Sequence, residues 1–366
     1  MIKKIIVTAF LLLLLLFFQS FMYCSIVLMV LSFIWKVEFK TMFPFKYSYT
    51  MLIGLFVLLL YCVLPQYKVD SDNNQQLIYQ DEEGNPTPPP MSHYLANIIF
   101  PEEELINIGL WSLRFSTDHL GYLGIGTSLI EQLENEIVEI DDFYRPIRNL
   151  NWRGQFMMSG ITSQIFNMKG WGHKTKSVYL IKPKKYIPDK KYPVVFFCHG
   201  FLGNWKYYQG ILRGLEDCFV LSLATETWNG LFTNDDVKNI FDIQLPFLQR
   251  MGYQIDEENL HLIGFSNGGS AADIAYKNYS SKFRTIVYMS TDINQTNSIS
   301  SRILLVSGGK DVEATTHPEA YRRIRINGGE VALFRNENDT HYIFLKKSPE
   351  IMAFLNEEMI LNIDDK

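Results

Sequence analysis

The strongest constraint on the fold comes from residues 260–269, where an apolar run meets a glycine-rich turn. Residues 260–263 read Leu-His-Leu-Ile, and residues 264–269 read Gly-Phe-Ser-Asn-Gly-Gly. A short apolar run predicts a buried strand, and glycines permit a turn in which other side chains would collide with neighbouring backbone. We therefore predict a strand that turns sharply into a helix, with Ser266 at the apex of the turn.

The rest of the C-terminal half predicts a sheet buried on both faces. Short apolar runs rich in Val, Ile and Phe are separated by stretches of helical length, and an amphipathic helix is expected at residues 349–359. Such runs are typical of parallel strands covered by helices on both sides. We predict strands at residues 177–181, 192–198, 219–224, 260–264, 285–290, 303–307 and 331–335. The fold class is therefore α/β, a doubly wound and mostly parallel sheet over residues 175–366.

Two charge-free apolar runs, residues 5–35 and 47–64, precede this region. Each exceeds or approaches the roughly 20 apolar residues that a membrane span needs. A cleaved signal peptide is the alternative for the first run, but its apolar core is far longer than the roughly 7–15 residues of such leaders. We expect residues 1–65 to form a transmembrane anchor of two spans, or of three if the first run is a hairpin.

Charges around these runs bear on the topology. The connector at residues 36–46 carries Lys36, Lys40 and Lys46 against Glu38, which favours the cytoplasmic side. This pattern predicts a multi-pass membrane protein with an extracytoplasmic catalytic domain. A charged N-terminus would also prefer the cytoplasm, and only three spans satisfy both preferences.

The segment between the anchor and the sheet divides in two. Residues 66–92 are polar and end in three consecutive prolines, which predicts a linker stiffened near its end. Residues 93–174 have helix-like apolar spacing in two places. We interpret them as an N-terminal extension that fills a surface of the core, with a partial cover over the site as the alternative.

Net charge, cysteine content and the spacing of metal ligands limit what the protein can bind and how its fold is stabilised. The net charge of -5 argues against a nucleic-acid binder, which normally has a basic face. The four cysteines form no disulfide framework, although a single bridge between Cys198 and Cys218 stays open. No spacing of metal ligands is present, and we expect neither a metal nor a cofactor.

Candidate catalytic residues follow the strands in the order Ser266, Asp311, His341. A serine hydroxyl needs a base, usually histidine, which in turn needs an acid to orient it. Asp311 follows the strand at residues 303–307 through a Gly-Gly-Lys turn, and His341 follows the last strand. Helix capping is the alternative role for Asp311. Asp292, after the preceding strand, is the competing acid, but the Gly-Gly turn and the position favour Asp311. His317 is the competing base, but it lies within six residues of Asp311, at the start of a predicted helix.

Acyl transfer also needs donors for the oxygen that becomes negative, usually two backbone N–H groups. Asn267, directly after the serine, should supply one. The other is expected from Phe201, in the loop His-Gly-Phe-Leu-Gly at residues 199–203 that follows a predicted strand. His199 would then shape this loop and would not be the base.

Together, the Gly-x-Ser-x-Gly turn, the loop at residues 199–203 and the order serine, aspartate, histidine resemble the α/β-hydrolase superfamily over about half the chain. The segment Tyr-Pro-Val-Val at residues 192–195 and the turn at residues 264–269 are similar to the dienelactone hydrolase-like and bacterial serine esterase branch. Dienelactone hydrolases proper use a cysteine nucleophile, so only the branch of the fold carries over. The short connection between the strands at residues 285–290 and 303–307 also leaves no room there for a large cap.

The resemblance implies a serine hydrolase, most simply a carboxylic-ester hydrolase that forms an acyl-enzyme on Ser266. The two N-terminal apolar runs predict that this hydrolase is membrane-anchored. The implied substrate is a small-molecule or lipid-like acyl compound. Peptidase, thioesterase and acyltransferase chemistries use the same residues and remain alternatives. A non-catalytic, membrane-tethered binding protein on the same fold is the alternative from another class.

Overall fold

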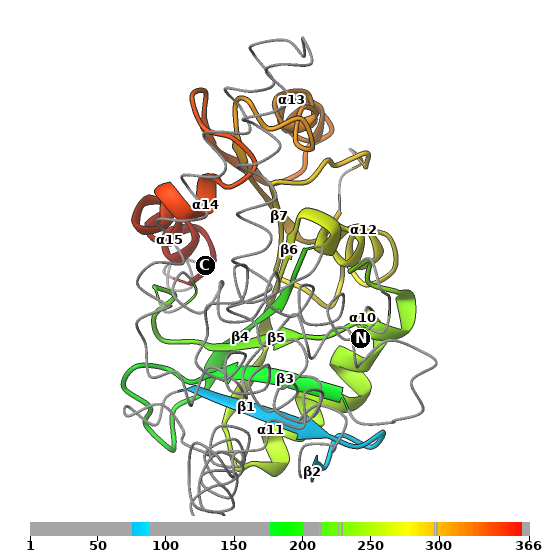
Figure 1. Cartoon of the computed structure of the whole chain (residues 1–366), viewed down its shortest axis with the longest axis vertical. Coiled ribbons are helices and arrows are strands. Elements are labelled where there is room, and N and C mark those ends of the chain that lie inside the picture. Colours follow the sequence, from blue (N-terminus) through cyan, green and yellow to red (C-terminus); the bar gives the residue numbers. More distant parts are fainter. Residues whose placement is uncertain are drawn as a thin grey trace, which may run out of the picture.

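The computed structural model describes residues 75–87, 176–200, 212, 214–225, 227, 230–295, 297 and 299–360. These residues form a nine-stranded sheet in the order β2-β1-β3-β5-β4-β6-β7-β8-β9, with helices packed on it (Figure 1). The strands are β1 (Gln75–Gln80), β2 (Pro86–Thr87), β3 (Lys176–Ile181), β4 (Tyr192–Cys198), β5 (Phe219–Leu223), β6 (Ile255–Phe265), β7 (Thr285–Met289), β8 (Arg302–Gly308) and β9 (Val331–Asn336). The helices are α10 (Asn234–Asn239), α11 (Leu245–Arg250), α12 (Gly269–Asn278), α13 (His317–Ile326), α14 (Ile343–Lys346) and α15 (Ser348–Leu355), with shorter 3-10 or π turns η2 (Ile240–Gln244), η3 (Ser266–Gly268) and η4 (Asn356–Ile360).

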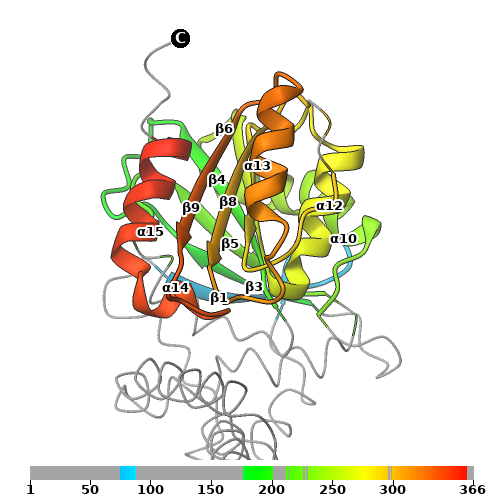
Figure 2. The same cartoon turned by 90° about the horizontal axis from the view of Figure 1, so that it is seen from above.

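The predicted α/β architecture is confirmed. Strands β5, β4, β6, β7, β8 and β9 are parallel neighbours, whereas β1, β2 and β3 form an antiparallel edge. In β4, Val194 and Phe196 belong to one apolar cluster, and Val195 and Phe197 belong to the other. Figure 2 shows α10, α12 and α13 on one face of the sheet and α14 and α15 on the opposite face. Because helices cover both faces, these strands read as continuous apolar runs and do not alternate.

The interpretation of residues 66–92 as a linker is wrong for residues 75–87, which form β1 and β2. Strand β1 pairs with β3 along its whole length, from Gln75 opposite Ile181 to Gln80 opposite Lys176. The buried amides of Gln80 and Gln244 also donate to each other, over 3.0 and 3.3 Å. A strand near the edge can keep polar residues that satisfy one another, so its sequence resembles that of a loop.

The prediction of a multi-pass membrane protein with an extracytoplasmic catalytic domain is contradicted. In the part of the chain that the structure describes, none of the helices has the length and apolar character needed to cross a bilayer. The apolar runs at residues 5–35 and 47–64, on which the prediction rested, lie outside the described residues, as does the extension at residues 93–174. The disulfide that the sequence left open is not formed, since Cys198 and Cys218 are both free and buried.

The chain order changes direction at β4. From β4 the chain passes to β5 on one side, and then crosses to β6 on the other side. In open parallel sheets, the loops at the carboxyl ends of the strands leave a crevice at such a switch point, and ligands bind there. The fold therefore directs attention to the carboxyl ends of β4 and β6, where the Gly-Phe-Ser-Asn-Gly-Gly turn begins.

Strand β6 also contains an unusual buried histidine. His261 is fully buried between β4 and β7, and neither ring nitrogen has a hydrogen-bond partner among the described residues. Burial, with a contribution from the charge of Arg284, lowers the pKa of His261 to about 3. The folded protein therefore excludes a proton that the unfolded chain accepts below about pH 6.5.

We predict that His261→Leu makes the protein less sensitive to acid. In the wild type, the folded state cannot accept the proton that the unfolded state binds at this histidine. The free energy of unfolding therefore decreases as the pH falls from about 6.5 towards 3, by up to about 1.4 kcal/mol per pH unit. Urea unfolding from pH 8 to pH 4 should show the stability of the variant rising relative to the wild type below pH 6.5. Parallel curves for the two proteins would contradict the prediction.

Candidate active site

Ser266 lies at the sharp turn between β6 and α12 that the sequence predicts. Its φ angle is +50°, a left-handed conformation that is uncommon for residues other than glycine. A Cβ atom at Gly264 would lie 2.5 Å from the carbonyl oxygen of Gly268, and one at Gly268 would overlap the carbonyl oxygen of Cys198. The glycines therefore let β6, α12 and the end of β4 come together around a strained serine.

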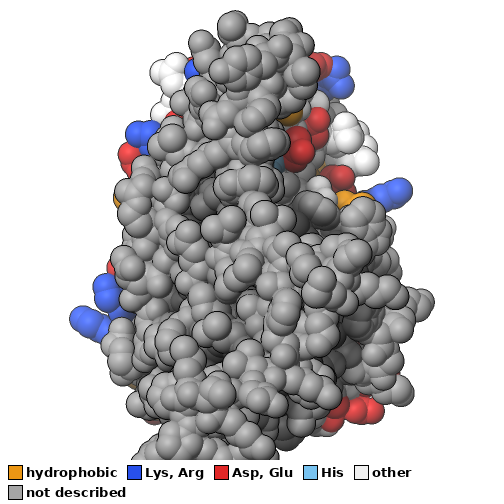
Figure 3. Space-filling model, viewed as in Figure 1, with side chains coloured by type: hydrophobic (Ala, Val, Ile, Leu, Met, Phe, Trp, Pro, Cys, Tyr) orange, Lys and Arg blue, Asp and Glu red, His pale blue; other side chains and the backbone are white. Residues whose placement is uncertain are grey.

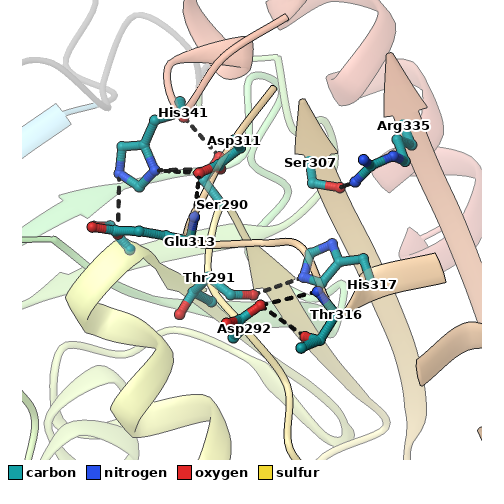
Figure 4. Close-up of polar contacts among 11 residues, drawn as sticks. Ser290, Thr291, Asp292, Ser307, Asp311, Glu313, Thr316, His317, Arg335 and His341 are labelled. Atoms are coloured by element: carbon teal, nitrogen blue, oxygen red, sulfur yellow. Dashed lines mark hydrogen bonds and ion pairs between the residues drawn. The ribbon is translucent and has the colours of Figure 1, made fainter. Parts of the chain in front are cut away.

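Asp311 and His341 meet at the same edge of the sheet, beyond β8 and β9. His341 Nδ1–H donates to the carboxylate of Asp311, with nitrogen–oxygen distances of 3.1 and 3.3 Å (Figure 4). Burial opposes the ionisation of Asp311, but hydrogen bonds from His341 and from the backbone N–H of Glu313, together with the charge interaction with His341, hold its pKa below the usual value. Asp311 is therefore an ionised, buried acceptor that fixes the orientation of the imidazole.

Glycines in the turn after β8 make this meeting sterically possible. A Cβ atom at Gly308 would overlap the carbonyl oxygens of Asp339 and Thr340, which directly precede His341. The backbone N–H of Lys310 donates to the backbone carbonyl oxygen of Asp339 over 2.9 Å, and the N–H of Gly309 donates to the backbone carbonyl oxygen of Asn336, at the end of β9, over 2.6 Å. Backbone contacts thus join the turn that carries the acid to the loop that carries the histidine.

Ser290, directly after β7, supports this loop from the other side. Its hydroxyl donates to the backbone carbonyl oxygen of His341 over 2.7 Å, and its φ angle is +50°, as in Ser266. The sequence placed Ser290 at the end of a strand but assigned it no role. Only its position at the same edge of the sheet could have indicated one.

Glu313 is the second residue that the sequence analysis missed. The hydroxyl of Ser266 donates to Glu313 Oε2 over 3.3 Å, and His341 Nε2 lies 3.7 Å from the same oxygen. The backbone N–H of Glu313 donates to Asp311 over 2.9 Å, while its side chain is 56% exposed. A half-exposed carboxylate therefore lies between the serine and the histidine, two residues after the predicted acid.

The competing residues are used elsewhere. Asp292 accepts hydrogen bonds from the N–H and hydroxyl groups of Thr316, over 3.1 and 2.8 Å, at the start of α13. His317 Nε2 donates to the carbonyl oxygen of Thr291 over 2.7 Å, and burial lowers its pKa to about 4. Figure 4 shows these residues as a separate group beside Asp311 and His341. Neither competitor contacts the Ser266 hydroxyl.

Of the two residues expected to supply N–H donors for the oxyanion, the structure describes one. Asn267 follows Ser266 in the short helix η3, whereas Phe201 lies outside the described residues. The loop that leads to Phe201 begins beside the serine, since a Cβ atom at Gly200 would lie 3.0 Å from Ser266 Cβ. His199 is fully buried, donates from Nδ1 to the carbonyl oxygen of Gly200 over 2.8 Å, and has its pKa lowered to about 4 by burial.

The site contains polar side chains but no metal-binding arrangement. Within the described ranges, no group of three or more His, Cys, Asp or Glu side chains is placed to hold a metal ion. What the described residues offer is a strained serine, a histidine held by a buried carboxylate, and a second carboxylate between them. The serine can act as a nucleophile, the histidine can accept and donate a proton, and the two carboxylates can carry negative charge.

Comparisons with known proteins found likeness at the level of structure alone. No known family profile and no curated protein sequence matches the chain. An acylaminoacyl peptidase from Pyrococcus horikoshii is 17% identical, with a TM-score of 0.41, over 50% of this chain and 39% of its own. A thermophilic esterase from Thermogutta terrifontis is 12% identical, with a TM-score of 0.41, over 52% of this chain and 90% of its own. A feruloyl esterase module from Clostridium thermocellum is 15% identical, with a TM-score of 0.38, over 49% of this chain and 83% of its own. The chain thus spans about 40% of the length of the Pyrococcus horikoshii peptidase.

The arrangement fits the α/β-hydrolase fold on its own geometry. A mostly parallel sheet carries a serine on the strained turn from β6 to α12, followed in the chain by an aspartate after β8 and a histidine after β9. The α/β-hydrolases share this order and this strand–turn–helix around the serine.

We predict that His341→Ala raises the pKa of Asp311 above its wild-type value. Burial continues to oppose ionisation in the variant, while the hydrogen bond and the charge interaction with the imidazole are lost. The pKa can be followed by ¹³C NMR of the side-chain carboxyl groups, with Asp311→Asn identifying the signal. Glu337→Gln changes an exposed carboxylate near this edge and should leave the Asp311 titration in place. An unchanged Asp311 titration in His341→Ala would show that the pair does not interact.

Proposed function

We propose that this protein is a serine hydrolase that cleaves carboxylic esters through an acyl-enzyme on Ser266. The hydrogen bond between Asp311 and His341, at the same sheet edge as the strained Ser266 turn, carries this proposal. His341 would act as the general base and then as the general acid, and Asp311 would orient it. The α/β-hydrolase resemblance of the sequence supports the same roles.

The geometry suggests how the reaction would proceed. With Nδ1–H bonded to Asp311, the neutral imidazole keeps Nε2 as the proton acceptor. Ser266 Oγ would attack the carbonyl carbon of the ester while its proton passes to Nε2. The tetrahedral oxygen would accept hydrogen bonds from the backbone N–H groups of Asn267 and Phe201. His341 would then protonate the leaving alcohol. In the second half of the reaction, His341 would take a proton from water as the water attacks the acyl-enzyme, and would return that proton to Ser266 Oγ as the acid leaves.

The position of Glu313 adds a condition to this sequence of steps. Its Oε2 atom accepts the Ser266 hydrogen bond and lies 3.7 Å from His341 Nε2. Proton transfer from the serine to the histidine requires the Glu313 side chain to turn away. Its backbone is tied to Asp311, but the carboxylate is half-exposed, so rotation about its side-chain bonds is sufficient.

Labelling with a fluorophosphonate probe tests this function whatever the natural substrate is. We predict that the purified protein is labelled and that Ser266→Ala abolishes labelling. His341→Ala should slow labelling by about a hundredfold or more, because general base catalysis contributes roughly 10²–10⁴. Labelling should be followed by fluorescence of the protein band over time, with the fold of each variant checked by circular dichroism.

Ser307→Ala is the matched control for the serine. Ser307 is buried in β8 and accepts a hydrogen bond from Arg335 over 3.3 Å, so its loss should not alter labelling. If the folded wild type is not labelled at any pH from 5 to 9, the hydrolase proposal fails and a binding protein on this fold becomes the better interpretation.

We further predict that Gly308→Ala reduces the labelling rate although it alters none of the proposed catalytic groups. The added methyl group would push the backbone at Asp339 and Thr340 away and displace His341. A misplacement of about 1 Å can cost about a hundredfold in rate. In Gly252→Ala, the methyl group enters open space at a residue with a φ angle of +82°, so stability should fall but labelling should not. Equal labelling rates in both variants would show that the glycine contact does not position the histidine.

A further inference from the structure

Glu313 places a negative charge where the proposed reaction gains little from one. Its Oε2 atom is 3.3 Å from Ser266 Oγ, and the reaction would create a negative oxygen next to that serine. A nearby carboxylate disfavours a second negative charge, as it does in any pair of like charges. With a neutral ester, Glu313 would therefore both occupy the space between serine and histidine and oppose the transition state.

The charge of Glu313 is only weakly compensated. Within the residues that the structure describes, its Oε2 atom lies 3.7 Å from His341 Nε2, a contact that becomes an ion pair only when the imidazole is protonated, and no lysine or arginine forms a salt bridge with Glu313. On the face of the molecule drawn in Figure 3, acidic side chains are visible at the upper right, together with some basic and hydrophobic side chains. A carboxylate in such a place attracts cations that approach the serine.

The position of Glu313 also indicates which end of the substrate it would meet. His341 Nε2 is the atom that would hand a proton to the leaving group. Glu313 Oε2 lies 3.7 Å from this nitrogen, so a positive charge on the leaving group would come close to the carboxylate.

We propose that Glu313 selects substrates whose leaving group carries a positive charge, such as the amino alcohol of an ester. The cation would draw the carboxylate away from Ser266 and neutralise it, which frees the serine for His341. This inference rests on the proposed hydrolase function. It adds a specificity-determining residue and a chemical class of substrate to that function.

Protection from fluorophosphonate labelling tests the inference whatever the acyl group of the substrate is. Butylammonium, butan-1-ol and butanoate have nearly the same length and differ in charge. In the wild type, butylammonium should slow the labelling of Ser266 at concentrations about fivefold lower than butan-1-ol, as expected for a half-exposed ion pair. Butanoate should protect least, and added salt should remove the advantage of butylammonium.

Glu313→Gln keeps the shape of the side chain and removes its charge. The three compounds should then protect at similar concentrations. Glu337→Gln is the matched control, because Glu337 is 76% exposed and pairs with Arg335 over 3.0 Å. It should retain the wild-type order of protection.

The outcomes separate this inference from the function on which it rests. If the wild type is labelled at Ser266 but the charge of the three compounds makes no difference, the selectivity of Glu313 is refuted and the hydrolase proposal stands. The same holds if Glu313→Gln retains the preference for butylammonium. If the wild type is not labelled at all, both proposals fail.

Discussion

Backbone contact between the turn after β8 and the loop after β9 is the constraint on which the candidate site depends. Gly308 can approach the carbonyl oxygens of Asp339 and Thr340 only because it lacks a side chain. Asp311 belongs to the first of these segments and His341 to the second, so the backbone contact brings their side chains within hydrogen-bonding distance. The parallel sheet supplies the frame, because β8 and β9 are neighbours that end at the same edge.

Burial explains how much of the fold could be predicted from the sequence. The seven strands from β3 to β9 were all predicted within a few residues of their ends, except that β6 begins five residues earlier than expected, at Ile255. Strands covered on both faces need apolar side chains at every position, and that demand is visible in a single sequence. Strand β2 lies at the edge of the sheet and β1 lies next to it. The side chains of Gln80 in β1 and Gln244 form hydrogen bonds with each other, and the local sequence does not indicate a pairing over such a distance in the chain.

The sequence predicted the site residues whose position depends on the ends of strands. It did not predict the residues whose contacts depend on backbone torsion angles or on the direction of a side chain. Ser266, Asp311 and His341 each follow a strand of the parallel sheet, so chain order alone predicted that they would share an edge. The contacts of Ser290 and Glu313 depend on a positive φ angle and on the direction of a long side chain, respectively. Neither property can be read from residue type, which is why these two residues were missed.

The two carboxylates near the serine differ in burial, and burial separates their roles. Asp311 is almost fully buried and accepts hydrogen bonds from His341 and a backbone N–H, so it cannot move away without breaking them. Glu313 belongs to the same turn, but its side chain is half-exposed and can exchange the Ser266 hydroxyl for water or for a cation. Neighbouring carboxylates in active sites take different roles when their environments differ in this way. The short turn after β8 thus provides both a fixed acid, which would orient the base, and a movable one, which would respond to the substrate.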